Sequence, residues 1–296
     1  MYRTWVITRH TFIEAISQPI YSLLLSLGAA IIVVFMFLPF FTLGEDTVMF
    51  KVVGLDVINL LVLITTLFAT SKCIHEEIED RTMLTLMSKP VSRLEVLVGK
   101  YLGLIMSAGM AMLILGALLC LCTWYRVPGD YAISQRSIDE RDIARLTSLR
   151  NIHLNGLYPS LLLTWMQISV LAALSVAIST RFSLVVNLPT VIMLYLAGNL
   201  TRFIESAVSN GSIFTIALGN VLQTLLPFLG VFDIRKWAVY SQIGASGDMT
   251  EDRMVPLSFI WQNTAAAAGY GVCYIIFALA IGMLVFRNRE LGGNEG

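Results

Sequence analysis

The chain has 296 residues, of which 56% are hydrophobic and 14% charged, and its formal net charge is zero. Soluble domains carry about 25% charged residues, so this composition and a mean hydropathy of +0.76 exclude an ordinary soluble domain and indicate a membrane protein. The balanced charge provides no overall basic field, so nucleic acid is not an expected partner.

The first segment with helical character is TWVITRHTFIEAIS, residues 4–17. At helical period Trp5 and Phe12 fall on one side, and Glu14 falls on the other. A helix of this kind lies in the membrane interface, with Trp5 at the depth of the lipid headgroups. Pro19 separates it from the first long apolar run, so we expect an N-terminal interfacial helix.

Six apolar runs have the length needed to cross the hydrocarbon core, which takes about 20 helical residues. They must be helical in lipid, because unpaired backbone groups there are costly. The first lacks an A-x-A-like cleavage site, so we interpret it as a retained span and not as a signal peptide. The predicted spans of this single transmembrane domain, residues 1–296, are residues 20–41, 53–71, 101–124, 159–180, 184–200 and 265–286.

Basic residues favour a cytoplasmic N-terminus and a cytoplasmic C-terminus. With this orientation the short basic clusters at 72–100, Arg181, Arg287 and Arg289 all face the cytoplasm. Residues 125–158 then form an external loop. Its stretch RSIDERDIARLTSLR mixes both signs of charge, which is typical of a solvated helical face and not of a binding site.

A seventh apolar run, residues 213–232, allows two interpretations. It contains Gly219, Gln223 and Pro227. Pro227 would break a spanning helix, whereas a re-entrant pair of half-helices tolerates it when buried against protein. The re-entrant interpretation is favoured, and a full span stays open.

The segment between the second and third spans, residues 72–100, is densely charged. Acidic residues come early in it and Lys89 comes late, which suits the dipole of a short helix, and Pro90 ends that helix. Ser92 and Glu95 then form a capping box, so a new helix begins near Arg93 and continues into the third span. Such a helix–turn–helix could act as a lever that docks on a soluble partner, although any cytoplasmic loop can be charged and capped.

The pattern E-I-E-x-x-T followed by L-x-S-x-P-V-S-R-x-E-V-L-x-G-K-x-L-G resembles the cytoplasmic segment of ABC transporter permeases of the ABC-2 family. Arg81 departs from it, since a Gly is usual there, and residues 125–158 are a long insertion. The matching residues are Glu77, Glu79, Thr82, Ser88, Pro90, Val91, Ser92, Arg93, Glu95, Gly99, Lys100 and Gly103.

The resemblance implies a permease subunit of an ATP-driven exporter in the plasma (inner) membrane, with residues 72–100 as the coupling segment. A separate ABC-type ATP-binding subunit would bind ATP and Mg, and a second permease copy or homologue would complete the complex. An amphiphilic substrate fits the nearly uncharged spans better than a highly charged one, and a purely mechanical role is also compatible. The residues that the resemblance assigns to ATPase docking are Glu77, Glu79, Arg81, Thr82, Ser88, Pro90, Ser92, Arg93, Glu95, Gly99 and Lys100.

The chain shows no catalytic, cofactor-binding or metal-binding motif. The one Gly-Lys pair, Gly99–Lys100, lacks the preceding Gly and the following Ser or Thr of a P-loop. His75 and Glu76 lack the second His of a zinc protease. We therefore expect no enzymatic activity and no cofactor in this chain itself.

Two alternatives of other classes are an intramembrane enzyme and an ion channel or carrier without an ATPase partner. A carrier usually places ionisable residues deep in its spans. The candidates are Asp56 and the Arg202–Glu205 pair, which all lie near span ends. An interfacial residue and a simple ion pair explain them more readily.

Overall fold

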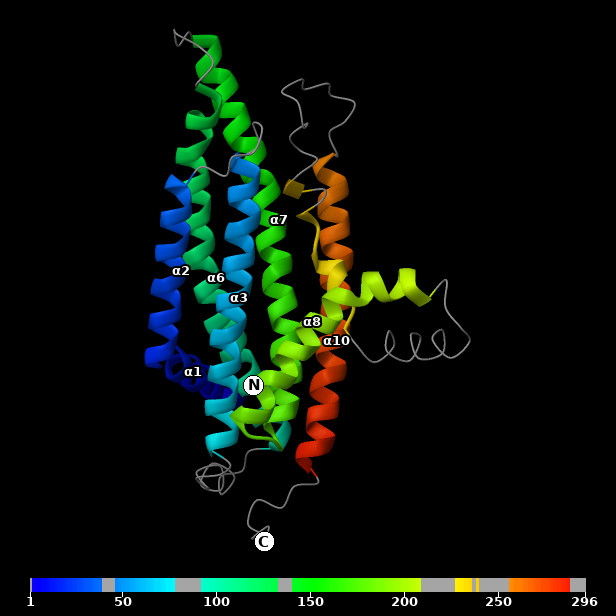
Figure 1. Cartoon of the computed structure of the whole chain (residues 1–296). Helices are drawn as coiled ribbons and strands as arrows, with labels where there is room; N and C mark the ends of the chain where they lie inside the picture. Colours follow the sequence, from blue (N-terminus) through cyan, green and yellow to red (C-terminus); the bar gives the residue numbers. More distant parts are fainter. Residues whose placement is uncertain are drawn as a thin grey trace.

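The computed structural model describes residues 2–38, 46–77, 92–132, 140–208, 227–235, 238–239 and 256–287, without the side chains of residues 75–76, 128–132, 140–146 and 200–208. All regular structure in these ranges is helical (Figure 1). The elements are α1 (Tyr2–Ile16), α2 (Pro19–Phe37), α3 (Asp46–Ser71), the π-helical η1 (Lys72–Glu76), α6 (Arg93–Ala132), α7 (Glu140–Ser179), α8 (Leu184–Val208), the 3-10 helix η2 (Leu229–Phe232) and α10 (Leu257–Arg287).

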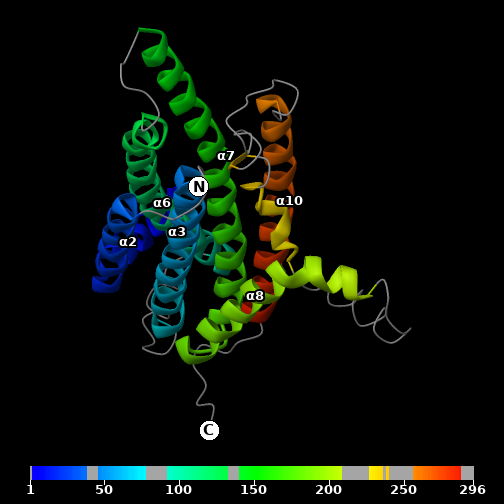
Figure 2. The same ribbon diagram turned by 45° about the horizontal axis from the view of Figure 1, so that its top comes forward.

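Five helices form a bundle, with α7 between the group α2, α3 and α6 on one side and α10 on the other (Figure 2). These five are long and apolar enough to cross a membrane. Helices α3 and α7 are the most buried, whereas α2 and α10 expose most of their apolar surface. The chain is thus a multi-pass α-helical protein, and five of the predicted spans have their counterparts in these helices.

Helix α1 lies across one end of the bundle, where α3 and α10 end and α6 begins (Figure 1). We call this the α1 end, and the opposite end the far end. Thr8 and Thr11 of α1 are buried, whereas Trp5 is exposed. A helix before Pro19 is thus confirmed, and its place in the membrane interface stays a prediction.

The predicted fifth span, residues 184–200, is not confirmed. The apolar part of α8, Leu184–Asn199, is shorter than the five spanning helices and than the roughly 30 Å of hydrocarbon. Helix α8 contains Pro189. It rises obliquely from the α1 end, and its last part runs sideways out of the bundle (Figures 1 and 2).

The segment 125–158, predicted as an external loop, is largely helical. Helices α6 and α7 have 40 residues each, or about 60 Å, and they project beyond the other helices at the far end (Figure 1). Hydropathy marks the length of helix that faces lipid, but the backbone hydrogen bonds of a helix continue into water. The apolar limits of these spans therefore do not mark the ends of the helices.

Of the predicted segment 213–232, residues 213–226 lie outside the described ranges. Its end, together with residues up to Arg235, is irregular backbone packed against α7, α8 and α10. Leu229 and Phe232 are buried, and the backbone N–H of Phe228 donates to the Tyr270 hydroxyl at 3.0 Å. Irregular backbone at membrane depth is tolerated where it is buried in protein.

Two glycines let α1 approach α6 closely. A Cβ atom on Gly103 would lie 2.7 Å from the carbonyl oxygen of Thr8 and from Cβ of Thr11. At Gly99 the nearest atoms would be 3.0 Å away, and the carbonyl of Gly99 accepts a hydrogen bond from Thr8 Oγ1 at 3.1 Å. Small residues thus allow the backbones of α1 and α6 to pack closely, as small residues commonly do between membrane helices.

We expect Gly103→Ala to force α1 away from α6 and to lower the free energy of unfolding by about 1–3 kcal/mol, the usual cost of overpacking. Gly269→Ala is the matched control, because a Cβ there meets no atom within 4 Å. Thermal unfolding in detergent should show a lower Tm for Gly103→Ala only. Equal Tm values for the two variants would contradict this packing.

Candidate functional site

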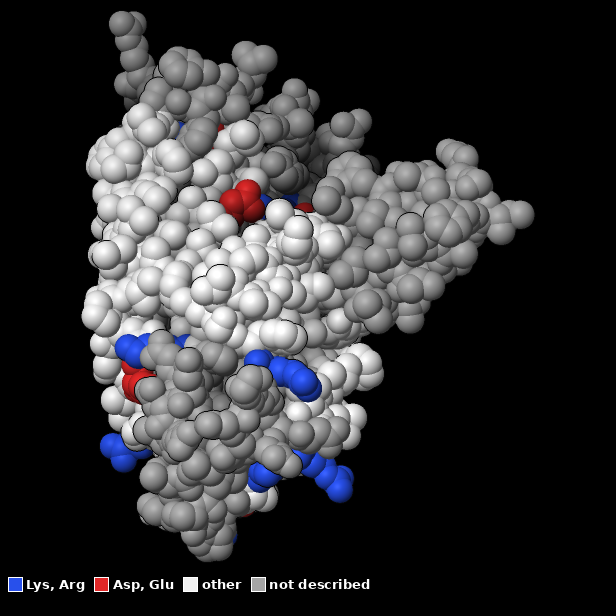
Figure 3. All heavy atoms as spheres, turned by 60° about the horizontal axis from the view of Figure 1, so that its bottom comes forward, with Lys and Arg blue, Asp and Glu red and all other residues white. Residues whose placement is uncertain are grey.

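The α1 end carries exposed charges and both described borders of the predicted coupling segment. In Figure 3, which brings this end forward, described Lys and Arg side chains are spread around it. Residues 78–91 lie outside the described ranges. The description of the site is therefore limited to the residues before and after them, which end at Glu77 and begin again at Ser92. The exposed basic residues near this end are Arg3, Arg9, Lys72, Arg181 and Arg287.

The predicted capping box is present at the start of α6. The backbone N–H of Ser92 donates to Glu95 Oε2 at 2.9 Å, and the backbone N–H of Glu95 donates to Ser92 Oγ at 3.2 Å. Helix α6 begins at Arg93 and runs without interruption through the bundle. Any force applied to the Ser92 end of the coupling segment therefore acts directly on a helix that crosses the whole protein.

Arg93 joins the start of α6 to the end of α10. Its Nη1 donates to the carbonyl oxygens of Phe286 at 3.0 Å and Arg287 at 2.9 Å. Its guanidinium lies 5.6 Å from the centre of the Phe286 ring. Carbonyls at a helix C-terminus lack partners within the helix and carry partial negative charge, so a cation is favourable there.

Lys100 joins the two borders of the coupling segment to each other. Its Nζ lies 2.5 Å from Oε2 of Glu77, and it also donates to the backbone carbonyl of Cys73. Lys100 is only 2% exposed, and Glu77 is the last described residue before the gap at 78–91. Glu77 is partly exposed, and we call this pair the Lys100–Glu77 clasp.

The π turn η1 lies directly before Glu77. Its residues Cys73 and Ile74 are buried. Gln18, between α1 and α2, contacts Cys73 through Nε2 and Sγ at 3.9 Å. A π turn changes the phase of a helix and often marks a functional site, and here the residues of the clasp lie at or beside it. The clasp therefore connects the end of α3 with α6, next to the junction of α1 and α2.

The structure thus shows where part of the predicted docking set lies. Arg93, Gly99 and Lys100 contact other helices of the same chain. Ser92 and Glu95 cap α6, and Glu77 belongs to the clasp. Glu79, Arg81, Thr82, Ser88 and Pro90 lie outside the described ranges. Docking on an ATPase stays a prediction for the whole set.

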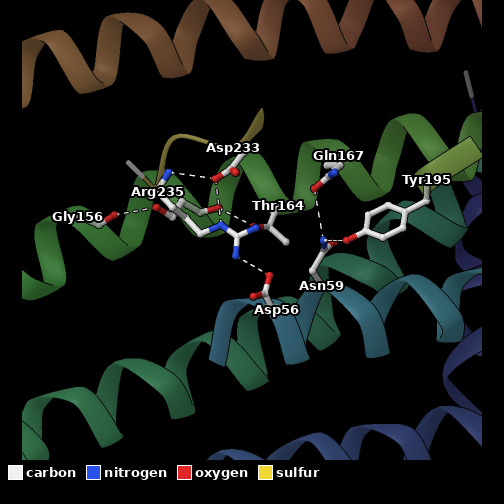
Figure 4. A network of polar contacts seen from close by, with 9 residues as sticks. Asp56, Asn59, Gly156, Thr164, Gln167, Tyr195, Asp233 and Arg235 are labelled. Carbon is white, nitrogen blue, oxygen red and sulfur yellow. Dashed lines mark hydrogen bonds and ion pairs between the residues drawn. The ribbon is translucent and has the colours of Figure 1, made fainter. Parts of the chain in front are cut away.

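A second polar group lies inside the bundle, between α3, α7 and α8 (Figure 4). Asn59, 4% exposed, donates through Nδ2 to the hydroxyl of Tyr195 at 3.1 Å and to Oε1 of Gln167 at 3.4 Å. Asn59 Oδ1 has no hydrogen-bond partner in the described part of the chain. The sequence shows these polar residues as scattered, and the fold brings them together.

Next to this group Asp56 pairs with a residue that the sequence analysis missed. Arg235 Nη1 lies 2.5 Å from Asp56 Oδ1, and Arg235 Nε donates to Asp233 Oδ1 at 3.0 Å (Figure 4). Burial alone would lower the pKa of Arg235, but the carboxylates of Asp233 and Asp56 outweigh it and raise that pKa. Asp56 is therefore more than an isolated interfacial residue, since it holds the 227–235 segment against α3.

The space among these side chains is small. The cavity bordered by Asn59, Gln167, Tyr195 and Arg235 has a volume of about 20 Å³, enough for about one water molecule. It cannot hold a solute of metabolite size in this conformation. The network therefore acts here as a connection between helices. The side chains of the Arg202–Glu205 pair lie outside the described residues.

A third polar group anchors the start of α8. Asn187, fully buried, contacts through Nδ2 the hydroxyls of Ser71 and Ser175 at 2.8 Å and Ser179 at 2.9 Å. These serines come from α3 and α7. Polar side chains that bond across helices contribute typically about 0.6–2 kcal/mol each in a membrane. They therefore help hold the shorter helix α8 in the bundle.

Together the five spanning helices, the crossing helix α1 and the capped segment at one end define a multi-pass α-helical membrane protein. A family profile described as "ABC-2 family transporter protein" matches residues 9–291. The match covers nearly the whole chain, and the chain belongs to the ABC-2 transporter family. Comparison with curated proteins gave no match.

The clasp can be tested by a double-mutant cycle. Glu77→Leu leaves the Lys100 ammonium buried without its carboxylate, and we expect a loss of about 3 kcal/mol of unfolding free energy. Glu77→Leu with Lys100→Met should recover most of that loss, because an apolar pair can replace a buried ion pair.

Unfolding of these variants in detergent provides the measurement. Arg9→Met is the control, since Arg9 is an exposed charge at the same end and its loss should change stability by about 0.5 kcal/mol or less. A double variant as unstable as the sum of its two single variants would show that the clasp does not exist.

Proposed function

We propose that this chain is the membrane-spanning subunit of an ATP-driven exporter, which receives its energy from a separate ATP-binding subunit. Membership of the ABC-2 family supports this proposal, because permeases of that family generally work with such subunits. The strongest structural support for this proposal comes from the contacts at the α1 end. Both borders of the 78–91 segment are tied to the spanning helices by capping, by Arg93 and by the clasp.

In the proposed orientation the α1 end and both termini face the cytoplasm of the plasma (inner) membrane. The exposed basic residues of this end support it, since positive charge is enriched on the cytoplasmic side. The ATP-binding subunit would dock on the coupling segment and bind ATP and Mg. A second permease copy or a homologue would complete the complex.

The contacts at the α1 end suggest how a displacement of the docked segment would spread. A push at residues 78–91 acts through Glu77 on α3 and through Ser92 on α6. The clasp prevents these two helices from separating, and Arg93 makes α10 follow α6. Helix α1 follows as well, because it lies directly on Gly99 and Gly103. We therefore infer that α1, α3, α6 and α10 move as one unit at this end.

The alternative of an ion-coupled carrier gains no support from the polar groups inside the bundle. Arg235 pairs with both Asp56 and Asp233, so each of these carboxylates has a cationic partner, and the neighbouring cavity has room for about one water. For a substrate, the nearly uncharged spans favour an amphiphile over a highly charged solute. A mechanical role, in which the complex drives an assembled periplasmic machine, fits the same contacts.

The proposal predicts that Pro90→Ala with Ser92→Ala weakens binding of the ATPase or uncouples hydrolysis from transport. Loss of a helix cap costs typically about 1 kcal/mol, which loosens the α6 border without unfolding the bundle. Co-purification with an ABC-type ATP-binding subunit, and the ATPase activity of the reconstituted complex, provide the two readouts.

Ser26→Ala is the matched control, because Ser26 is exposed on α2 and bonds only within its own helix. It should leave binding and coupling unchanged. Normal coupling in the Pro90/Ser92 variant would refute the role of the 72–100 segment in transmitting motion. Transport by the purified chain without any nucleotide-hydrolysing partner would refute the proposed ATP-driven function.

A further inference from the structure

An apolar groove runs between α6 and α7. Its volume is about 620 Å³, some thirty times that of the polar cavity beside Asn59. It lies within the membrane-spanning parts of both helices, which stand side by side in Figures 1 and 2. Its lining includes none of the described residues of the coupling segment or of the polar network.

Small residues on α6 create the hollow, and aromatic and aliphatic side chains on α7 form its opposite wall. A Cβ on Gly109 would lie 3.2 Å from Nε1 of Trp165, and a Cβ on Gly116 would lie 3.1 Å from Cδ1 of Leu161. The Trp165 indole is held in place by a hydrogen bond to the carbonyl of Ile105 at 3.4 Å. The groove is therefore shaped by fixed groups, and it opens sideways past Leu113, which is 71% exposed.

Beyond the far-end side of the groove, the same two helices carry a stacked cation. Trp124 follows Cys120, a lining residue, by one turn of α6, and Arg150 precedes Tyr158, another lining residue, by about two turns of α7. The Arg150 guanidinium stacks 4.6 Å from the centre of the Trp124 ring. Its buried Nε has no hydrogen-bond partner within the described ranges. Both residues lie near the ends of their spans, the depth at which arginine and tryptophan meet lipid headgroups.

An apolar groove with a stacked arginine beyond one end, at headgroup depth, is complementary in shape and charge to an anionic amphiphile. We propose that this groove is a binding site for an anionic phospholipid of the bilayer. Its acyl chain lies along the Gly109–Gly116 face, and its phosphate pairs with Arg150. The acyl chain of a zwitterionic lipid would fill the same groove. Its positively charged headgroup would repel Arg150, however, and so weaken the attraction between Arg150 and the lipid phosphate. The site does not depend on the ATPase partner or on the proposed transport.

The tryptophans at the groove allow a direct test by fluorescence quenching. With Trp5, Trp237 and Trp261 replaced by phenylalanine, Trp124 and Trp165 report on the groove alone. The full-length protein is reconstituted into phosphatidylcholine vesicles that contain either brominated-chain phosphatidylglycerol or brominated-chain phosphatidylcholine at the same mole fraction. Quenching by the anionic lipid should be stronger, by about fivefold in apparent binding constant for one arginine at the surface.

Two variants separate the parts of the site, and the ratio of the two quenching constants is compared within each. Arg150→Gln should bring the ratio to about one, whereas Ala117→Phe, at an exposed lining position, should reduce quenching by both lipids. Arg9→Gln, which removes an exposed charge at the other end, should leave the ratio unchanged. A ratio of one in the parent protein, or a ratio that survives Arg150→Gln, would overturn the proposal. If neither brominated lipid quenched the tryptophan fluorescence of the parent protein, the proposal would also be overturned, since a second protein copy would then occupy the groove.

Discussion

The buried ammonium group of Lys100 places the strongest constraint on the α1 end. A charge that is 2% exposed is tolerated only with close partners. Glu77 and the carbonyl of Cys73 provide them from the end of α3. The helix that follows the coupling segment is therefore bound to the one that precedes it. The same end also holds the cap at Ser92, the hydrogen bonds from Arg93 to the end of α10 and the packing of α1 on Gly99 and Gly103.

Elsewhere in the bundle, hydrogen bonds from polar side chains hold the helices together. Water drives no association between helices inside the hydrocarbon core, so close contact and hydrogen bonds hold them together. Asn187 attaches α8 to α3 and α7, and Asn59 joins the same three helices further along. At the far end Arg126 donates to the carbonyls of Phe35 and Leu38, which secures the end of α2 to α6. The two ends thus use arginines in the same way, each at a helix C-terminus.

Local chemistry was predictable from the sequence, whereas contacts between distant residues were not. The capping box at Ser92 and Glu95 and the helix before Pro19 follow from residues within a few positions of each other. The Asp56–Arg235 pair joins residues 179 positions apart, and nothing local marks them as partners. In the sequence Lys100 resembles the other charges of the 72–100 segment. Only the fold shows that it is buried against the end of α3. Hydropathy located five spans but hid the continuation of α6 and α7, because a helix does not end where the lipid ends.

The central claim is that the α1 end moves as one unit when nucleotide is hydrolysed. Distances between spin labels in the assembled complex test it most directly. In a background without the four native cysteines, labels replace the exposed residues Arg9 on α1, Leu94 on α6 and Arg287 on α10. We predict that the Arg9–Leu94 and Leu94–Arg287 distances stay constant through the ATP cycle, while the distance between the Leu94 positions of two copies changes. An ATP-dependent change in either distance within one copy would contradict the account.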